Sequence, residues 1–234
     1  MSYIFFNEII INFVRYCCKI IPLRKYLLIS ILYLLSLSSC GQEPVSKNTI
    51  TPSSNNENNT NTQAFNPFEK LSEYQRLIKR KHLNIQYVFV VDYSEHSGKK
   101  RMYVLDILKK KVVRKMMVAH GAKSETKIGY ATDFSNVPES NKSSLGYAIV
   151  NTRAYSQWGI HVKYWLDGIS RTNTNMRKRV MVLHSYRMVP SFETYPLPIV
   201  TSLGCVMISE DDMIYLDKLI KKQHNKRLLM DILG

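Results

Sequence analysis

The side chain best suited to covalent chemistry is Cys205, in the segment Ser202-Leu203-Gly204-Cys205. The chain has four cysteines, and the other three all lie within its first 40 residues. A Gly directly before a Cys leaves room for a substrate backbone and leaves nearby N–H groups able to face a developing oxyanion. We therefore take Cys205 as a candidate nucleophile and the Gly204 backbone as part of a candidate oxyanion site. The alternative is an inert thiol that packs as a small hydrophobic group.

His184 is the best candidate for the base that a nucleophilic thiol requires. It follows the apolar run 180–183, which predicts a buried strand, and it precedes Cys205 by twenty-one residues. The next residue, Ser185, has a carbonyl and a hydroxyl, either of which can orient an imidazole as the third member of a triad. Pairing with His184 is expected to lower the pKa of the thiol. The alternative is a histidine that is only hydrogen-bonded at a strand end.

The histidines do not form the pattern of a metal site. Zinc ligands commonly occur in pairs at i and i+2 or i and i+4. Consecutive histidines in this chain are separated by 14, 24, 41, 23 and 40 residues. The spacing therefore predicts no metal.

Residues 1–39 have the pattern of an export leader. Arg24 and Lys25 precede a twelve-residue apolar and hydroxylic run, 26–37, which is shorter than the roughly 20 residues needed to cross a bilayer. The run ends in Leu-Ser-Ser-Cys, which resembles a bacterial lipobox, so Cys40 is the expected lipidation site. A plain signal peptide or a membrane-anchored helix with an incidental cysteine is the alternative.

The segment that follows, 40–66, is rich in Asn, Thr and Ser and has no apolar periodicity. It predicts a flexible tether between the lipid anchor and a folded domain, 67–234. At 45% hydrophobic residues, the chain of 234 residues has enough apolar sequence for one such domain with a sizeable core.

The formal charge of +15, from 33 basic and 18 acidic residues, points to an anionic partner. The basic clusters are scattered over expected turns and helix ends, and they contain no motif of a nucleic-acid reader. An exported protein also rarely meets DNA. We therefore expect an anionic polymer of the cell envelope as the partner, and no nucleic acid.

The elements that must position Cys205 and His184 are mostly strands. Helical spacing predicts a helix over 68–82, and Ser209, followed by three acidic residues, predicts the N-cap of a second helix. Runs of β-branched and aromatic residues predict the strands 86–93, 101–107, 111–119, 180–183, 199–208 and a closing strand 228–233. The expected fold is mainly β, a mixed sheet or small sandwich with an N-terminal and a C-terminal helix.

Nine short blocks, in the same order along the chain, resemble the murein L,D-transpeptidase catalytic-domain family, a branch of the YkuD-type L,D-transpeptidases. The blocks are Phe89-Val90-Val91-Asp92-Tyr93, Arg101-Met102-Tyr103-Val104, Val118-Ala119-His120-Gly121, Phe134-Ser135-Asn136, Ser143-Ser144-Leu145-Gly146-Tyr147, Leu166-Asp167-Gly168, Asn175-Met176-Arg177-Lys178-Arg179, His184-Ser185 and Ser202-Leu203-Gly204-Cys205.

The resemblance implies a mainly β fold in which the Cys and His face each other at the mouth of a cleft, and a reaction on peptidoglycan stem peptides. Cys205 would attack the carbonyl between a diamino acid and the terminal D-Ala, and the resulting thioester would pass to an amine, forming a 3-3 cross-link. His184 would be the general base and acid, the Ser185 carbonyl would orient it, and the N–H groups of Gly204 and Cys205 would bind the oxyanion. No cofactor is implied. An L,D-carboxypeptidase or amidase, or a non-catalytic murein-binding lipoprotein, remains as an alternative.

The sequence departs from the family pattern around the nucleophile. Thr201 and Val206 stand where the branch tends to have Arg and Pro, and Ser185 stands where Gly is frequent. The candidates for binding the substrate are therefore Arg177, Arg179, Arg187 and Ser202. The resemblance and the leader together imply a monomeric lipoprotein of the bacterial cell envelope, anchored in the outer membrane and facing the periplasm.

Overall fold

The computed structural model describes residues 65–234, so the predicted leader, the lipidation site at Cys40 and nearly all of the predicted tether lie outside the described residues. Within 65–234, neither α-helix is long and apolar enough to cross a membrane. The elements, in chain order, are α3 (Leu71–Lys81), β1 (Tyr87–Asp92), β2 (Met102–Asp106), β3 (Lys111–Met116), β4 (Val118–Ala119), η1 (Ala122–Ser124), β5 (Glu125–Lys127), β6 (Tyr130–Ala131), β7 (Gly146–Tyr155), β8 (Val162–Gly168), β9 (Val182–Ser185), β10 (Val206–Ile208), α4 (Glu210–Lys221) and β11 (Leu228–Leu233).

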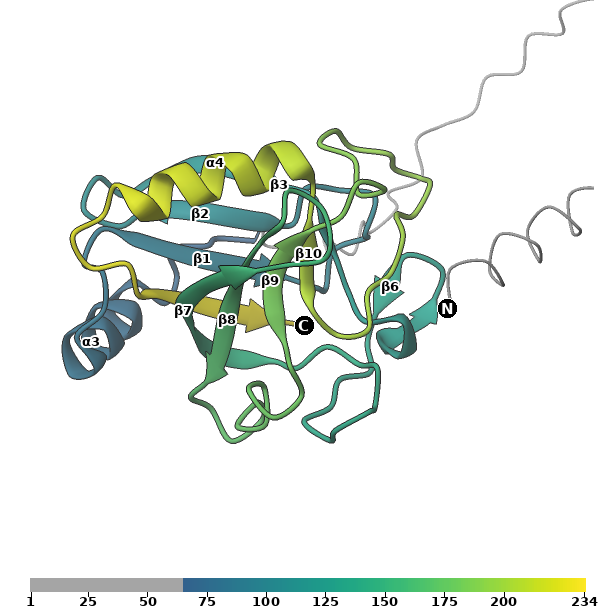
Figure 1. Cartoon of the computed structure of the whole chain (residues 1–234), viewed down its shortest axis with the longest axis horizontal. Coiled ribbons are helices and arrows are strands. Elements are labelled where there is room, and N and C mark those ends of the chain that lie inside the picture. The colour runs from purple at the N-terminus through teal and green to yellow at the C-terminus, as the bar shows by residue number, and fades with distance from the viewer. Residues whose placement is uncertain (1–64) are drawn as a thin grey trace, which may run out of the picture. The chain divides into compact units, whose positions relative to one another are not determined.

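Nine strands form one mixed sheet in the order β3-β2-β1-β11-β7-β8-β9-β10-β4 (Figure 1). The pairs β1–β11 and β9–β10 are parallel, and the other pairs are antiparallel. The two ends of this order, β3 and β4, are separated in the chain only by Met117. Because one residue spans only about 3.8 Å, the sheet must curl until its two edge strands nearly meet.

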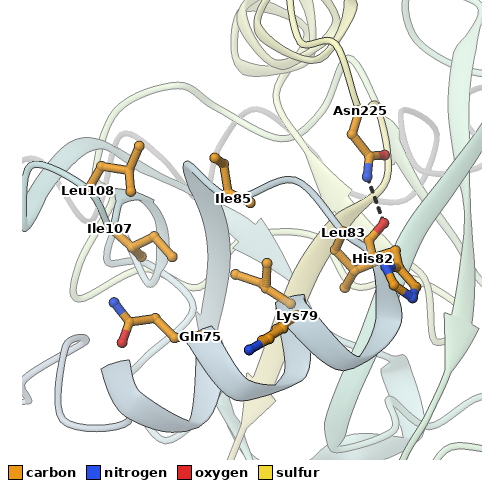
Figure 2. Close-up of a pocket in the computed structure, with 9 residues that line it drawn as sticks. Gln75, Lys79, His82, Leu83, Ile85, Ile107, Leu108 and Asn225 are labelled. Carbon is orange, nitrogen blue, oxygen red and sulfur yellow. Dashed lines mark hydrogen bonds between the residues drawn. The ribbon is translucent and has the colours of Figure 1, made fainter.

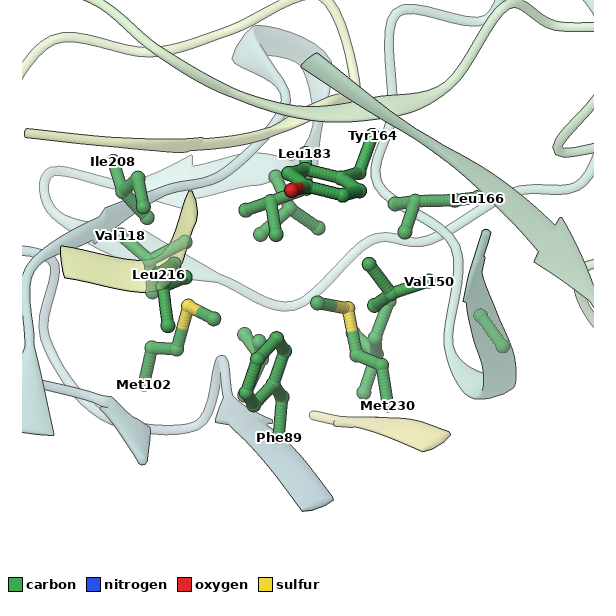
Figure 3. Packing of buried hydrophobic residues seen from close by; sticks show 14 of the residues in the cluster. Phe89, Met102, Val118, Val150, Tyr164, Leu166, Leu183, Ile208, Leu216 and Met230 are labelled. Carbon is green, nitrogen blue, oxygen red and sulfur yellow. The ribbon is translucent and has the colours of Figure 1, made fainter. Parts of the chain in front are cut away.

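The two helices cover opposite faces of β1. Alternate residues of a strand point to opposite faces. Accordingly, Phe89 and Val91 belong to the core cluster that includes α4, whereas Val88 and Val90 belong to the cluster that includes α3. Figure 3 shows the first cluster, in which Phe89 on one side faces Leu183 on the other. The prediction of a mainly β fold with two flanking helices is confirmed.

The C-terminal helix begins where the sequence predicts. The Ser209 hydroxyl accepts a hydrogen bond from the Asp212 N–H at 3.1 Å, and this satisfies one of the free donors of the first turn. Met213, Leu216 and Ile220 lie on one face of α4 and are fully buried in the core. This helix therefore covers the face of the sheet opposite the candidate site.

The predicted strand 199–208 is only partly correct, because β10 covers Val206–Ile208 alone. The Ser202 backbone instead bonds to the segment before η1, and Gly204 has a φ of +116°, which ends extended structure. Residues 199–205 therefore form a loop, and Cys205 stands at its end.

The predicted strand 180–183 is shifted along the chain to Val182–Ser185. Val180 has a φ of +56° and donates its N–H to the Arg177 carbonyl, so the chain is still in a turn at that residue. The shift places His184 inside β9, with regular strand partners on both sides. The predicted strand 111–119 is divided at Met117 into β3 and β4.

Candidate active site

His184 lies in β9, and Cys205 directly precedes the adjacent parallel strand β10. The register pairs Leu183 with Val206 and His184 with Met207, so Cys205 comes level with Val182. Residues in register share a face, and residues two apart on one strand also share it. Cys205 and His184 are therefore diagonal neighbours across the β9–β10 pair.

Both side chains line one cavity of about 690 Å³. His184 is nearly buried at its floor, with 7% of its surface exposed, whereas Leu203 is 74% exposed. On the opposite face of β9, Leu183 is buried in the main core, which holds the strand rigidly. The residues lining the cavity are Tyr155, Ser156, Gln157, Trp158, Lys163, Val180, Val182, His184, Tyr186, Thr201, Ser202, Leu203, Cys205 and Met207.

The Ser185 carbonyl sets the tautomer of His184. The distance from His184 Nδ1 to the Ser185 carbonyl oxygen is 3.0 Å. A carbonyl oxygen only accepts, so Nδ1 carries the hydrogen and the Nε2 lone pair of the neutral ring is left free. The Ser185 hydroxyl is used elsewhere, because it accepts a hydrogen bond from the Ile160 N–H at 3.1 Å.

Burial lowers the pKa of His184, and the nearby positive charge of Lys163 lowers it further, against the Ser185 carbonyl, which raises it. The imidazole is therefore neutral at pH 7 and able to accept a proton.

Burial raises the pKa of the Cys205 thiol. The Val182 backbone and the positive charges of Arg179 and Lys163 act in the opposite direction and offset only part of this effect. The prediction of a lowered thiol pKa is therefore wrong for this structure. Because the imidazole beside it is neutral, it supplies no positive charge to stabilise a thiolate, and the resting pair is a neutral thiol and a neutral imidazole.

Ser202 holds the loop that carries the thiol. Its hydroxyl donates to the Cys205 carbonyl at 2.8 Å and accepts from the Gly204 N–H at 3.1 Å. Its own N–H donates to the His120 carbonyl at 2.8 Å, and its carbonyl accepts from the Ala122 N–H at 2.7 Å. The Gly204 N–H is thus already occupied. For the N–H of Cys205, no hydrogen bond is recorded within the described part of the chain.

Gly204 is required by the loop itself. Its φ of +116° lies in a region that L side chains rarely adopt, and a Cβ at this position would lie 2.8 Å from the Lys142 carbonyl oxygen. The sequence predicts that this Gly makes room for a substrate backbone, whereas the contacts found at this position are made by the protein's own chain.

None of the three arginines predicted to bind substrate lines the cavity. Arg177 forms a two-point ion pair with Asp167, with N–O distances of 2.6 and 3.0 Å. Arg179 donates to the Ser135 and Lys142 carbonyls at 2.6 Å, so it braces the segment on which Gly204 rests. Arg187 is exposed.

Lys163 lines the cavity but is not among the site residues that the sequence predicts. The signal was the alternation in 162–166, where Lys163 and Trp165 lie between buried residues, but β8 was not among the predicted strands. The register sets Lys163 directly opposite His184. Only this pairing reveals that the lysine belongs to the site.

Residues 56–229 match the protein family described as the L,D-transpeptidase catalytic domain. The chain belongs to this family. The match spans Cys205, His184 and every other residue that lines the cavity. Among curated proteins, no match to the chain was found.

Solved structures similar to this L,D-transpeptidase catalytic domain include an L,D-transpeptidase from Xylanimonas cellulosilytica, at 15% identity and a TM-score of 0.33, covering 63% of this chain and 60% of that one. Bd1075 from Bdellovibrio bacteriovorus matches at 12% identity and a TM-score of 0.39, covering 66% and 49%. The helical cell shape determining protein Pgp2 from Campylobacter jejuni matches at 9% and 0.38, covering 69% and 54%. The chain thus spans about half to three fifths of these solved chains.

Behind the loop that carries Cys205 in the L,D-transpeptidase domain lies a buried polar network. Arg101 is fully buried, its Nη2 lies 2.7 Å from His120 Nδ1, and its guanidinium also donates to the Val118 carbonyl. His120 Nε2 in turn lies 3.0 Å from Glu125 Oε2. Burial, with the charge of Arg101, lowers the pKa of His120 to about 4. The backbone carbonyl of His120 is the acceptor for Ser202, so this network supports the loop.

A second cavity, of about 660 Å³, lies beside α3, and its polar lining residues are Gln75, Lys79, His82 and Asn225 (Figure 2). Its walls are mainly apolar, from Ile78, Leu83, Ile85, Ile107 and Leu108, and they contain neither a thiol nor a carboxylate. Across residues 65–234, no three His, Cys, Asp or Glu side chains gather at one point to hold a metal ion. Of these two cavities, only the β9–β10 cavity contains a cysteine.

Proposed function

We propose that this domain is a cysteine acyltransferase that cleaves the bond between the diamino acid and the terminal D-Ala of a peptidoglycan tetrapeptide stem and forms a 3-3 cross-link. The observation that carries the proposal is the diagonal placement of Cys205 and His184 in one cavity, with His184 Nε2 left free by the Nδ1 contact to Ser185. Membership of the L,D-transpeptidase family supports the choice of substrate.

In the first half-reaction, the Cys205 sulfur attacks the carbonyl carbon of the diamino acid while its proton passes to His184 Nε2. Because the pair starts as a neutral thiol and a neutral imidazole, the proton transfer and the formation of the S–C bond occur together, and no free thiolate accumulates. The Cys205 N–H is the available donor for the oxyanion, since the Gly204 N–H is bonded to Ser202. Collapse of the tetrahedral intermediate breaks the C–N bond, and the imidazolium protonates the departing D-Ala amine.

In the second half-reaction, the amine of a neighbouring stem attacks the thioester. His184 accepts a proton from this amine and returns one to the Cys205 sulfur as the S–C bond breaks. The product is a new amide, and the enzyme is restored. If water attacks instead, the product is a free tripeptide.

The test is incubation of the full chain with purified tetrapeptide muropeptides, followed by mass spectrometry of the products. We expect cross-linked dimers together with free D-Ala, and a transient acyl adduct on Cys205. The Cys205→Ala variant should give none of these. His184→Gln, which removes the base and keeps a side chain of similar size, should reduce turnover by at least about 100-fold.

The other outcomes of this experiment are informative. Tripeptide without dimer would replace transfer with hydrolysis, as in an L,D-carboxypeptidase. The absence of product and of any adduct with a carbapenem would contradict the enzymatic proposal and leave a murein-binding protein.

We also propose that Cys40 is lipidated and that 40–66 serves as a tether, so that the monomeric domain works in the periplasm from the outer membrane. The Leu-Ser-Ser-Cys sequence supports this placement. In cells fed a labelled fatty acid, the protein should carry the label and fractionate with the outer membrane. The Cys40→Ser variant should lose both properties, and label on that variant would contradict the proposal.

A further inference from the structure

Among the residues that the structure describes, Lys163 is the one lysine or arginine that lines the β9–β10 cavity. No aspartate or glutamate lines this cavity, and no ion pair within residues 65–234 includes Lys163. Lys163 and Arg177 both lie over the indole ring of Trp165. Unlike Lys163, Arg177 is neutralised by an ion pair with Asp167. The cavity therefore presents an uncompensated positive charge to whatever binds in it.

The register places this charge beside the catalytic pair. Lys163 on β8 lies directly opposite His184 on β9, and His184 in turn lies opposite Met207 on β10. These three residues form one row across the strands. Directly opposed residues have Cβ atoms about 5 Å apart. Cys205 belongs to the neighbouring row and lies two strands from β8. The ammonium is therefore on the His184 side of the nucleophile.

The side chain is guided by an aromatic neighbour. The Lys163 Nζ lies 4.9 Å from the centre of the Trp165 ring, and Trp165 is two residues away on the same face of β8. A cation held over an aromatic face keeps its position without losing its net charge. The half-buried Lys163 is thus held beside the cavity floor and is still free to pair with an anion.

The position of Lys163, on the His184 side of Cys205, determines which part of a bound substrate meets its charge. The leaving amine must lie near His184, because the imidazolium protonates it. In a peptide whose last residue leaves, the terminal carboxylate is two bonds beyond that nitrogen. We propose that Lys163 forms a carboxylate-binding subsite for the leaving residue, so that the enzyme acts on the last peptide bond of donors with a free C-terminal carboxylate.

This inference rests on the proposed function for its natural ligand, but the charge itself can be tested without turnover. Iodoacetate and iodoacetamide both alkylate a cysteine: the sulfur displaces iodide, an S–C bond forms, and the thiol proton passes to the buffer. The two reagents differ in that only iodoacetate carries a carboxylate. The ratio of their rates at Cys205 therefore cancels any change in the thiol pKa and reports attraction of the carboxylate.

In the full chain, with modification of Cys205 followed by peptide mass spectrometry, Lys163→Met should lower the iodoacetate-to-iodoacetamide rate ratio by at least about threefold, the size expected for loss of one nearby charge. Lys163→Arg should keep the ratio close to that of the wild type. The matched control is Lys218→Met, which removes the same charge from an exposed position on α4, behind the opposite face of β9. An unchanged ratio in Lys163→Met would overturn the inference.

A second measurement uses tetrapeptide donors with a free or an amidated C-terminus. Lys163→Met should lower kcat/KM for the free acid by about tenfold or more and should have little effect on the amide. If neither peptide is consumed by the wild type while the alkylation ratio depends on Lys163, the proposed function fails and the anion subsite stands. If the peptides are consumed equally well by wild type and Lys163→Met, the proposed function stands and the subsite fails.

Discussion

The Nη2 atom of Arg101 lies 2.7 Å from His120 Nδ1, and both side chains are almost completely buried. Since a guanidinium only donates, His120 Nδ1 is the acceptor, and its Nε2 hydrogen points to Glu125. This arrangement requires a neutral imidazole. His120, whose carbonyl accepts from Ser202 in the loop that carries Cys205, is thus held by a contact that protonation would break.

The first prediction concerns the stability of this network as a function of pH. The pKa of His120 is about 4 in the folded chain and about 6.5 in an unfolded one. Between these values the unfolded chain binds a proton that the folded chain does not, so the free energy of unfolding falls as the pH drops from about 6.5 to about 4. Between pH 7 and pH 5 the loss due to His120 should be about 1 to 2 kcal/mol.

Urea unfolding at these two pH values measures the effect. His120→Asn retains an acceptor near Arg101 and removes the titrating group, so its stability should fall less between pH 7 and pH 5 than that of the wild type. His224→Asn, at an exposed position, is the control and should follow the wild type. Equal pH dependence in His120→Asn and wild type would contradict the assignment. His184 and His96, whose pKa values are also lowered by burial, contribute to the dependence that remains.

The second prediction concerns the reactivity of the thiol. Because burial raises the pKa of Cys205, its alkylation by iodoacetamide should rise with pH through a midpoint above the usual thiol value of about 8.5. Lys163→Met removes one of the charges that offset burial, so it should move the midpoint to still higher pH. The measurement is the rate of modification of Cys205 across pH 6 to 10.5. A midpoint near pH 7 would instead indicate a thiolate and imidazolium pair in the resting enzyme.

The third prediction tests the loop conformation at Gly204. In Gly204→Ala, the new methyl group meets the Lys142 carbonyl, and the residue must hold a φ of +116°. We expect a loss of about 1 to 3 kcal/mol in the free energy of unfolding and at least a tenfold loss of activity. Leu203→Ala is the control, since this neighbouring side chain is 74% exposed and should change stability by less than about 0.5 kcal/mol. Calorimetry compares the stability of the two variants, muropeptide turnover measures the loss in Gly204→Ala relative to the wild type, and a fully active Gly204→Ala variant would contradict the account.

The fourth prediction separates the two polar groups of Ser185. The carbonyl orients His184, whereas the hydroxyl accepts from the Ile160 N–H. Ser185→Ala keeps the carbonyl, so turnover per folded molecule should stay within a few-fold of the wild type. Stability should fall by about 1 to 3 kcal/mol, because the Ile160 N–H loses its acceptor. Turnover that drops as far as in His184→Gln would show that the hydroxyl, rather than the carbonyl, supports the base.

Local sequence was sufficient for several elements of the fold. The three acidic residues after Ser209 predict the start of α4, and the β-branched runs predict β1, β2 and β11 close to their observed limits. These signals depend on side-chain propensity and on groups a few residues apart, both of which can be read from a single sequence. The paired strands β7 and β8 were not predicted. The two strands pair with each other across a short connection, but their outer partners, β11 for β7 and β9 for β8, come from later in the chain.

By itself, the sequence predicts Cys205, His184 and Ser185 as the reacting residues, and the blocks around them identified the family. Only the tertiary structure decided how these groups behave. The β9–β10 register makes the thiol and imidazole neighbours, burial raises the pKa of one and lowers that of the other, and β8 brings Lys163 to the same face. The physical reason is that pKa and charge compensation depend on solvent exclusion and on distances between strands, which are properties of the folded chain.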